Sequence, residues 1–327
     1  MPSGARGYHH TAMWDAAVEL AAAGERAFSA FAGAVAGAAP GWLALGVALH
    51  LANQVLRGRG WYVLVRTACV GDPALRPRDA IAAWVAGAGA GGVASARGGD
   101  AVRVLLLSRR TPRAGCPLLT GTLVAEGAGE LAVGVVVLSA ALVLGVGPEL
   151  SASPTTAVLL LAAAVLVLVL IAGAMRIPRL RGVVAGVGRG CAALRAPATY
   201  GRRVLPWQLA SRACRLAALA CFLAAFHLPV TLAAVLLVAF AQGSGRLLPF
   251  APASVGAGAA MLAASFAAVT GTAASAGQLA AFFIGTSAVL TAVGTVLTAA
   301  ICVRAVSWRG LAETLRVARR TPVQAPV

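Results

Sequence analysis

The chain has 327 residues, of which 60% are hydrophobic and only 11% are charged, whereas soluble domains are about half apolar and about a quarter charged. The composition therefore predicts a membrane protein and excludes an ordinary soluble domain. The net charge of +17 comes from 27 arginines without a single lysine, and these lie between apolar runs, so we expect anionic lipid head groups as partners and no nucleic acid.

Residues 1–40 form a segment distinct from the rest of the chain. Within it, residues 14–39 carry Asp15, Glu19, Glu25 and Arg26 beside a partial apolar stripe at helical spacing. This pattern fits an amphipathic helix on the membrane surface and a marginal first span equally well. A basic stretch followed by an apolar core and a cleavage site is absent, so no signal peptide is expected.

Eight apolar runs occupy most of the remaining chain, and a spanning helix needs about 20 apolar residues. They predict an all-α polytopic membrane protein with about six to eight transmembrane helices, a membrane domain over residues 41–305 and a basic tail over 306–327. The runs are 41–56, 80–96, 118–147, 155–175, 209–227, 230–250, 255–275 and 279–303.

The connections between these runs differ sharply in arginine content. Four of them are arginine-rich, namely 57–78, 97–113, 176–203 and 304–320, and three carry no arginine, namely 148–154, 228–230 and 276–278. Basic connections stay in the cytoplasm, so we expect the C-terminus on the cytoplasmic side of a bacterial plasma membrane.

Two segments are predicted to be interrupted or re-entrant. The run 80–96 separates two basic connections that both favour the cytoplasm, and it is rich in glycine and small residues, so we expect it to enter the membrane and return. Residues 241–258 contain Pro249 and Pro252, which break helices, beside the charged Arg246. Paired interruptions in two halves are typical of a binding site at the bilayer midplane and of an inverted repeat, although the halves do not align residue by residue.

Two acids lie inside the long apolar run 118–147. Glu126 and Glu130 are its only charges, and a carboxylate at the bilayer centre costs about 2.5–3.5 kcal/mol on insertion scales. Their i, i+4 spacing puts both side chains on one helical face, so we expect them to point into a protein or water-filled interior. The alternative is a helix end at the membrane surface with hydrated carboxylates.

Several arginines are candidates for lipid contact. Arg103 and Arg246 are candidate phosphate ligands, because guanidinium binds phosphate oxygens in a bidentate fork. Asp100 is a candidate partner at the same site, or alternatively the cap of a surface helix. Arg212 and Arg215 lie near the start of a span, so we expect them to extend to the cytoplasmic interface.

Four sequence features succeed one another in a recognisable order. They are Trp61 after basic residues, GGDAVRVLLL at 98–107, TLVAEGAGEL at 122–131 and LPFAPASVGAG at 248–258. Together they resemble the lysylphosphatidylglycerol synthase transmembrane region family, also called flippase-like, over about residues 41–305. The resemblance implies binding roles for the family's first acid and following arginine, its acidic pair and its second-half turn, which correspond here to Asp100, Arg103, Glu126, Glu130, Pro252, Gly256 and Gly258.

The chain also departs from the family pattern. Gly127 stands where an arginine usually follows the first acid of the pair, and Ala259 and Ala260 stand where an acid often follows the second-half turn. The counter-charge of the glutamates is therefore expected from Arg103, from Arg246, from the lipid or from a proton.

The family is associated with moving lipids between leaflets, so the resemblance implies a lipid translocator. Its substrate would be an anionic or aminoacylated phospholipid or a polyprenyl-linked lipid. A non-transporting partner of a lipid-modifying enzyme is an alternative that the departures leave open. A membrane enzyme acting on lipid phosphates is a weaker alternative, because the four histidines form no catalytic motif and the sequence has no P-loop or metal-ligand set. We expect no enzymatic activity and no cofactor.

Overall fold

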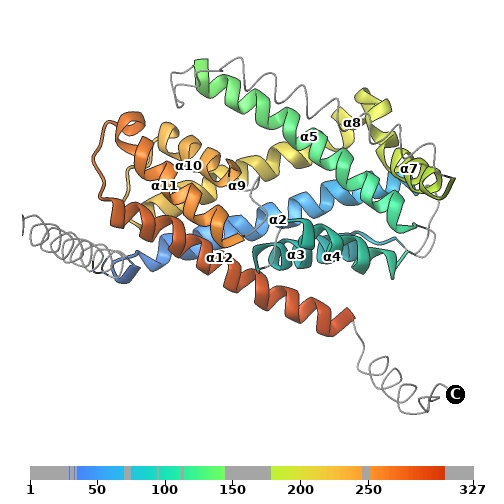
Figure 1. Cartoon of the computed structure of the whole chain (residues 1–327), viewed down its shortest axis with the longest axis horizontal. Coiled ribbons are helices and arrows are strands. Elements are labelled where there is room, and N and C mark those ends of the chain that lie inside the picture. Colours follow the sequence, from blue (N-terminus) through green and yellow to red (C-terminus); the bar gives the residue numbers. More distant parts are fainter. Residues whose placement is uncertain are drawn as a thin grey trace, which may run out of the picture.

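The computed structural model describes residues 35–69, 75–93, 96–111, 114–143, 178–244 and 251–305, together with Ser29 and Gly33. This part of the chain contains helices and connecting turns and no strand, which confirms the all-α prediction (Figure 1). The elements are α2 (Pro40–Ala68), α3 (Pro77–Val93), α4 (Ala96–Ser108), α5 (Cys116–Val143), α7 (Pro178–Gly190), the 3-10 helix η1 (Cys191–Arg195), α8 (Pro197–Arg203), α9 (Leu205–Ala225), α10 (Leu232–Ser244), α11 (Ala251–Thr270) and α12 (Ala276–Ala305).

Among the described helices, α9 and α12 are both long enough and apolar enough to cross a bilayer. Helices α2 and α5 have 29 and 28 residues, which corresponds to a length of about 40 Å, but they carry charged side chains. Helices α10 and α11 contribute shorter apolar stretches. The run 155–175 lies outside the described residues, so the number of six to eight spans and the repeat stay predictions.

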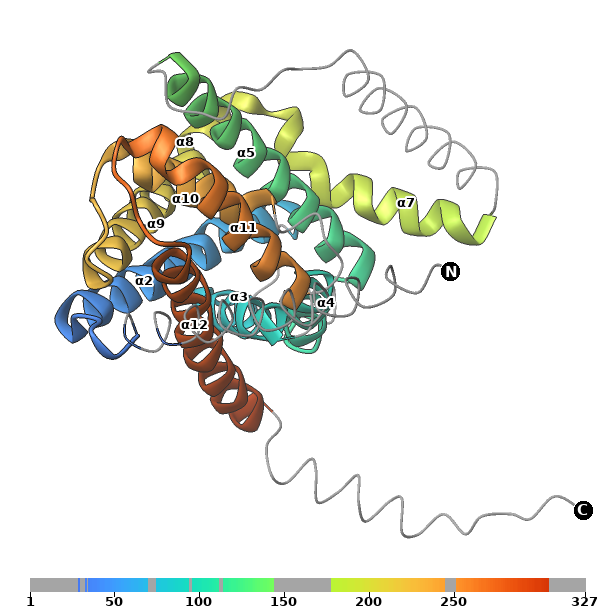
Figure 2. The same cartoon turned by 60° about the vertical axis from the view of Figure 1, so that its left-hand side comes forward.

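Helices α2 and α9 form the central pair of the molecule (Figures 1 and 2). They are antiparallel, because Gly46 faces Phe222 while Gly60 faces Trp207. A side chain at Gly46 would collide with the Phe222 ring, so glycine is required there for the two helices to approach.

Helix α2 continues well beyond the apolar run 41–56. Residues 57–68, which the arginine count assigns to a connection, are helical and largely buried. Local apolar content thus locates the start of the helix but not its end. As a result Arg57 lies within the bundle rather than on the surface.

The predicted re-entrant element is a helical hairpin. Within the run 80–96, α3 is continuous to Val93, and α4 begins at Ala96 and returns beside it, while residues 94 and 95 lie outside the described part of the chain. Gly91 approaches Gly99, whereas Gly87, one turn earlier in α3, approaches Arg103, one turn later in α4, so the two helices are antiparallel. On its other side α3 packs on α12, where Thr298 Oγ1 donates to the Ala86 carbonyl at 3.0 Å. The small residues therefore serve close helix packing.

The second predicted interruption falls between α10, which ends at Ser244, and α11, which begins at Ala251. Residues 245–250, including Arg246, lie outside the described part of the chain. Pro252 occupies the first turn of α11, where a missing amide N–H is tolerated. Helices α9 to α12 share an apolar core around Phe222, Phe266 and Phe282.

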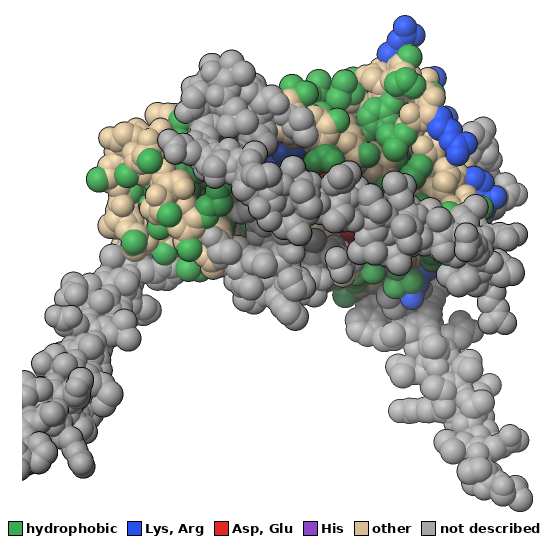
Figure 3. Space-filling view, turned by 45° about the horizontal axis from the view of Figure 1, so that its top comes forward, with side chains coloured by type: hydrophobic (Ala, Val, Ile, Leu, Met, Phe, Trp, Pro, Cys, Tyr) green, Lys and Arg blue, Asp and Glu red, His purple; other side chains and the backbone are tan. Residues whose placement is uncertain are grey.

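The two ends of the bundle differ in surface chemistry. Figure 3 shows arginine side chains at one end, whereas the visible described surface at the opposite end carries no charged side chain. The arginine-rich end includes α7, η1 and α8, in the segment 176–203 that the sequence marks as basic.

Candidate functional site

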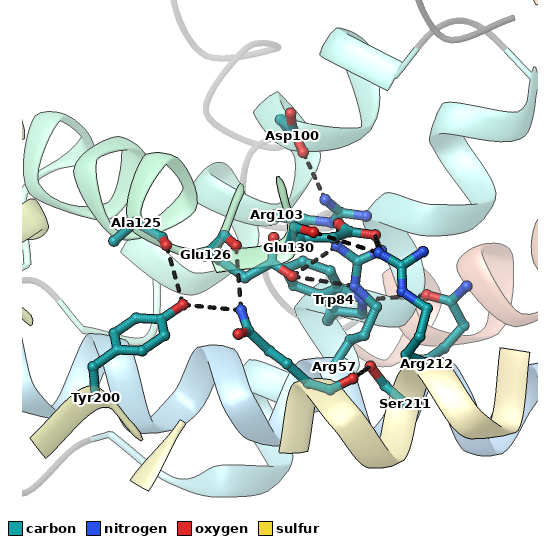
Figure 4. A network of polar contacts seen from close by, with 12 residues as sticks. Arg57, Trp84, Asp100, Arg103, Ala125, Glu126, Glu130, Tyr200, Ser211 and Arg212 are labelled. Carbon is teal, nitrogen blue, oxygen red and sulfur yellow. Dashed lines mark hydrogen bonds and ion pairs between the residues drawn. The ribbon is translucent and has the colours of Figure 1, made fainter. Parts of the chain in front are cut away.

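One arginine holds both glutamates of α5. Arg57 Nη2 donates to Glu126 Oε1 at 2.7 Å, and Nε donates to the same oxygen at 3.2 Å. Arg57 Nη1 donates to Glu130 Oε1 at 3.0 Å, and Nη2 also contacts Glu130 Oε2. The planar guanidinium thus forms a clamp on two carboxylates one helical turn apart (Figure 4).

This cluster is buried. The side chains of Arg57 and Glu126 are only 13% and 8% exposed, and that of Glu130 is 24% exposed. Both carboxylates therefore point into the protein, as the i, i+4 spacing predicts, rather than lying hydrated at a helix end. Charges in such a site need good geometry and additional hydrogen bonds, because each has lost its water.

A second arginine supports Glu130 from α9. Arg212 Nη2 lies 3.7 Å from Glu130 Oε1 and donates to the Glu130 carbonyl at 3.5 Å. The side chain of Arg212 is 19% exposed, so it points inward, and the expectation that it extends to the interface is wrong. Two arginines thus balance the two carboxylates.

The departure from the family at Gly127 does not leave the pair without a counter-charge. Gly127 is exposed, and a Cβ built on it meets no atom within 4 Å. An arginine at this position would begin on the outer face of α5, away from the pair. The counter-charge comes instead from Arg57 on α2.

Trp84 contacts two guanidinium groups. The ring centroid is 4.9 Å from Arg57 Cζ and 3.9 Å from Arg103 Cζ, which are distances of cation–π contacts. Its indole Nε1 donates to Gln54 Oε1 at 3.2 Å, and this bond fixes the plane of the ring. Arg103 also donates to Asp100 at 2.6 Å, so its ion-pair partner is the neighbouring acid.

The structure thus brings Asp100 and Arg103 to the edge of the cluster rather than its centre. Asp100 lies inside α4, which begins four residues earlier at Ala96, so it is not the residue that caps this helix. Arg103 packs on Trp84 and acts electrostatically on Glu126, so the expected counter-charge from Arg103 is present. Arg57 adds the direct ion pairs with both glutamates.

A small pocket opens beside the clamp. Its free space is about 10 Å³, roughly what one water molecule needs. One wall is the acidic face of α5, and the other is a polar stripe of α9 at positions i, i+3, i+4 and i+7. The lining residues are Asn53, Arg57, Glu126, Glu130, Val133, Gln208, Ser211, Arg212 and Arg215.

The pocket is positive overall. It is lined by three arginines and two glutamates, and three positive charges minus two negative charges leave one positive charge. Arg215, like Arg212, lines this interior space instead of reaching the membrane surface as expected. A partly desolvated positive pocket favours an anionic group.

A neutral network holds α5 against α8 and α9 behind the acids. Gln208 Nε2 donates to the Glu126 carbonyl at 3.3 Å and to Tyr200 Oη at 2.9 Å, and Tyr200 Oη donates to the Ala125 carbonyl at 3.3 Å. Burial raises the pKa of the Tyr200 phenol, whereas the hydrogen bond from Gln208 acts in the opposite direction. The contact requires glycine at position 129, since a Cβ there would overlap with Tyr200.

Trp61 has a structural part in the same region. It is fully buried, and its Nε1 donates to Thr122 Oγ1 at 3.0 Å. The ring also lies 5.8 Å from that of Trp84. The tryptophan therefore fixes α5 against α2 one turn away from the glutamates.

The second-half candidates are not part of the described cluster. Arg246 lies outside the described residues, as does the side chain of Pro252. Gly256 is exposed on α11, and a Cβ there would meet no atom within 4 Å. Among the described residues, no three His, Cys, Asp or Glu side chains lie close enough to hold a metal ion.

Sequence reasoning missed Arg57 and the polar face of α9. A usable signal was present in both helices, since each carries polar residues at i, i+3, i+4 and i+7 within apolar sequence. In α2 these are His50, Asn53, Gln54 and Arg57, and in α9 they are Gln208, Ser211, Arg212 and Arg215.

Comparison with known proteins connects these features to a family. The model of the family described as "Lysylphosphatidylglycerol synthase TM region" matches residues 16–297. Neither a curated protein nor a solved structure matches the chain.

Proposed function

We propose, since the chain belongs to the lysylphosphatidylglycerol synthase TM region family, that it moves a phospholipid between membrane leaflets by passing the head group through the charged pocket. Membership of this family indicates a membrane domain associated with lipid metabolism or transport. The substrate is an anionic or aminoacylated phospholipid or a polyprenyl-linked lipid. The lipid leaves chemically unchanged.

The observation that carries the proposal is the clamp of Arg57 on Glu126 and Glu130 inside a bundle of membrane length. Buried ion pairs contribute little net stability compared with apolar packing, so stability alone does not account for one here. The adjoining space adds Arg212 and Arg215 and one net positive charge. These groups can exchange partners with a lipid phosphate.

The head group enters by replacing existing ion pairs. In the pocket as it stands each carboxylate is bonded to arginine, and there is room for about one water molecule. A lipid phosphate can replace a carboxylate as the partner of Arg57 or Arg212, because guanidinium binds phosphate and carboxylate in the same bidentate geometry. A released carboxylate then accepts an ammonium group where the head group has one. For a head group that carries an ammonium group, no charge is left without a partner during this exchange.

The orientation follows the arginine distribution. We place the arginine-rich end, with α7, η1 and α8, at the cytoplasmic face of a bacterial plasma membrane, where anionic lipids attract it. The C-terminus lies on the same side. Glu126 then lies in the cytoplasmic half of α5 and Glu130 at its middle, and lipid enters from the inner leaflet.

A leaflet-accessibility assay in proteoliposomes tests this function. Tail-labelled fluorescent phosphatidylglycerol is equilibrated between leaflets, and an impermeant quencher measures the rate at which it crosses. We expect the wild-type protein to accelerate crossing and the Glu126→Ala plus Glu130→Ala variant to lose at least about tenfold of that rate. Asp79→Asn, an acid outside the cluster on α3, is the matched control and is expected to keep it.

The same assay separates the alternatives. Undiminished transfer by the double alanine variant contradicts the role of the pair. If the wild-type protein gives no transfer and co-purifies stoichiometrically with a lipid-modifying enzyme, the partner function replaces the proposed one.

A further inference from the structure

A second polar cluster lies deeper in the bundle than the clamp. Arg215 Nη2 on α9 donates to Gln242 Oε1 on α10 at 3.4 Å. His50 on α2 is within electrostatic reach of Arg215, and its Nε2 lies 3.2 Å from Gln54 Nε2. Three helices thus contribute donor-bearing side chains to one place.

This cluster extends up to two helical turns beyond the clamp. His50 precedes Arg57 by seven residues on α2, and Arg215 follows Gln208 by seven residues on α9, which is about 10 Å in each helix. Because the two helices are antiparallel, both displacements run in the same direction, away from the arginine-rich end. The polar faces of α2 and α9 therefore form one continuous seam.

The cluster lies near the middle of a spanning helix. Arg215 has ten residues of α9 on each side, from Leu205 to Ala225, and this is one of the two described helices apolar enough to cross a bilayer. Ionisable residues at such a depth are rare and usually mark the path of a substrate or ion. Arg215 also lines the pocket that contains Glu126 and Glu130, so the two places communicate.

The chemistry of the deeper cluster differs from that of the clamp. The clamp has two carboxylates, which accept hydrogen bonds only, whereas Arg215, His50 and Gln242 all carry N–H donors. A guanidinium beside an imidazole and a carboxamide suits a phosphodiester. An ammonium group would bind better to the carboxylates of the clamp.

We propose that Arg215, with His50 and Gln242, forms a second station that receives the phosphate of the head group after it leaves Arg57 and Arg212. This inference rests on the proposed function and adds a site to it. The phosphate passes from one guanidinium to the next along the seam toward the bilayer midplane. Arg212, one turn of α9 before Arg215, bridges the two stations.

The test compares Arg215→Gln with Arg66→Gln in the leaflet-accessibility assay. Arg66 is exposed on α2, donates to the Tyr62 hydroxyl, and provides the same substitution outside the seam. We expect Arg215→Gln to slow the crossing of phosphatidylglycerol at least about tenfold, because a charge-assisted hydrogen bond is lost. Arg215→Lys should recover part of the rate, and Arg66→Gln should keep the wild-type rate.

A binding measurement locates the defect. Short-chain phosphatidylglycerol added in detergent should still stabilise Arg215→Gln against heat, because Arg57 and Arg212 of the first station are intact. Gln242→Leu supplies a second variant that leaves every charge in place, and we expect it to slow crossing several-fold without weakening this stabilisation.

The outcomes separate the inference from the function on which it rests. Crossing at the wild-type rate by both Arg215→Gln and Gln242→Leu overturns the second station and leaves the proposed function standing. No crossing with the wild-type protein overturns the proposed function itself. Inorganic phosphate distinguishes a free ion from a lipid head group: uptake of labelled phosphate into the vesicles through Arg215 would overturn the lipid assignment, and its absence is the expected result.

Discussion

The two ends of the α2–α9 pair differ in the side chains that they enclose: one end is apolar and the other is charged. At one end Phe222 packs against Gly46 within an apolar core, where Phe226 and Phe282 meet edge to face at 5.8 Å. At the other end the same two helices enclose Arg57, Glu126 and Glu130 with a space for about one water molecule. The apolar end is arranged for stability, whereas the charged end holds groups that can exchange partners.

Substitutions at the two ends should therefore have different consequences. Removing apolar contacts at Phe222 should reduce stability and leave transfer by the folded protein unchanged. Removing charges at the clamp should affect transfer whether or not stability is restored.

The largest effect is expected from Arg57→Gln. Two buried carboxylates lose their main partner, and breaking a buried ion pair on one side destabilises by about 3–5 kcal/mol. Denaturant unfolding in detergent micelles measures the loss, and the proteoliposome assay should show no transfer above the protein-free rate. Combining Arg57→Gln with Glu126→Gln and Glu130→Gln should recover most of the stability, but lipid transfer should not return. A single Arg57→Gln variant with wild-type stability would contradict the clamp.

Phe222→Ala should destabilise by about 3–5 kcal/mol, because it leaves a cavity against Gly46 and the surrounding aromatic rings. Transfer per folded molecule should stay within about twofold of wild type, since no charged group is touched. Unfolding and transfer are measured on the same preparation. A loss of transfer in fully folded Phe222→Ala would remove the functional distinction between the two ends.

Gly127 and Gly129 on α5 allow the same substitution by alanine to be compared on an open face and on a packed face of one helix. Gly129→Ala forces a methyl group into Tyr200 and Gln208 and should destabilise by about 1–3 kcal/mol, while also slowing transfer. Gly127→Ala meets open space and should stabilise by about 0.5–1 kcal/mol through helix propensity. Unfolding of both variants under one set of conditions checks the difference. Equal changes in the two variants would show that α8 and α9 do not pack against this face of α5.

The smallest effect concerns Tyr200, which lies outside the spanning helices. Burial raises the pKa of its phenol above the ordinary value of about 10, so its stabilising contribution is complete below that pH and is lost as the pH rises through the higher folded-state pKa. Tyr200→Phe should lower the unfolding free energy by about 0.5–1.5 kcal/mol near neutral pH and should weaken the alkaline decline. Identical alkaline profiles for the two proteins would contradict the buried position of Tyr200.

The sequence predicts the all-helical architecture, the start of each described span and the inward orientation of Glu126 and Glu130. Apolar runs and i, i+4 spacing are local properties, so they can be recognised in the sequence without knowledge of the tertiary structure. The family resemblance depends in the same way on short motifs and their order, and the family match extends over residues 16–297.

The partners of the glutamates depend on tertiary structure and are not predicted by local patterns. Arg57 follows an apolar run, and the arginine count places it in a surface connection, although α2 continues through residues 61–65 to Ala68 and packs against α3, α5 and α9. Local patterns likewise place Arg212 and Arg215 at the membrane interface, because they do not show which helices pack against α9. Comparing the polar faces of α2 and α9 would have placed all three arginines on one seam.

The head-group path is tested most directly by the accessibility of Ser211, a buried pocket residue on α9. In a protein whose six cysteines are replaced, Ser211→Cys and Phe222→Cys are exposed to a charged, impermeant thiol reagent in proteoliposomes. We predict that Ser211→Cys reacts, that phosphatidylglycerol slows this reaction relative to a neutral lipid, and that Phe222→Cys stays unreactive. Equal reactivity at the two positions, or no protection by the anionic lipid, would contradict a head-group path between α2, α5 and α9.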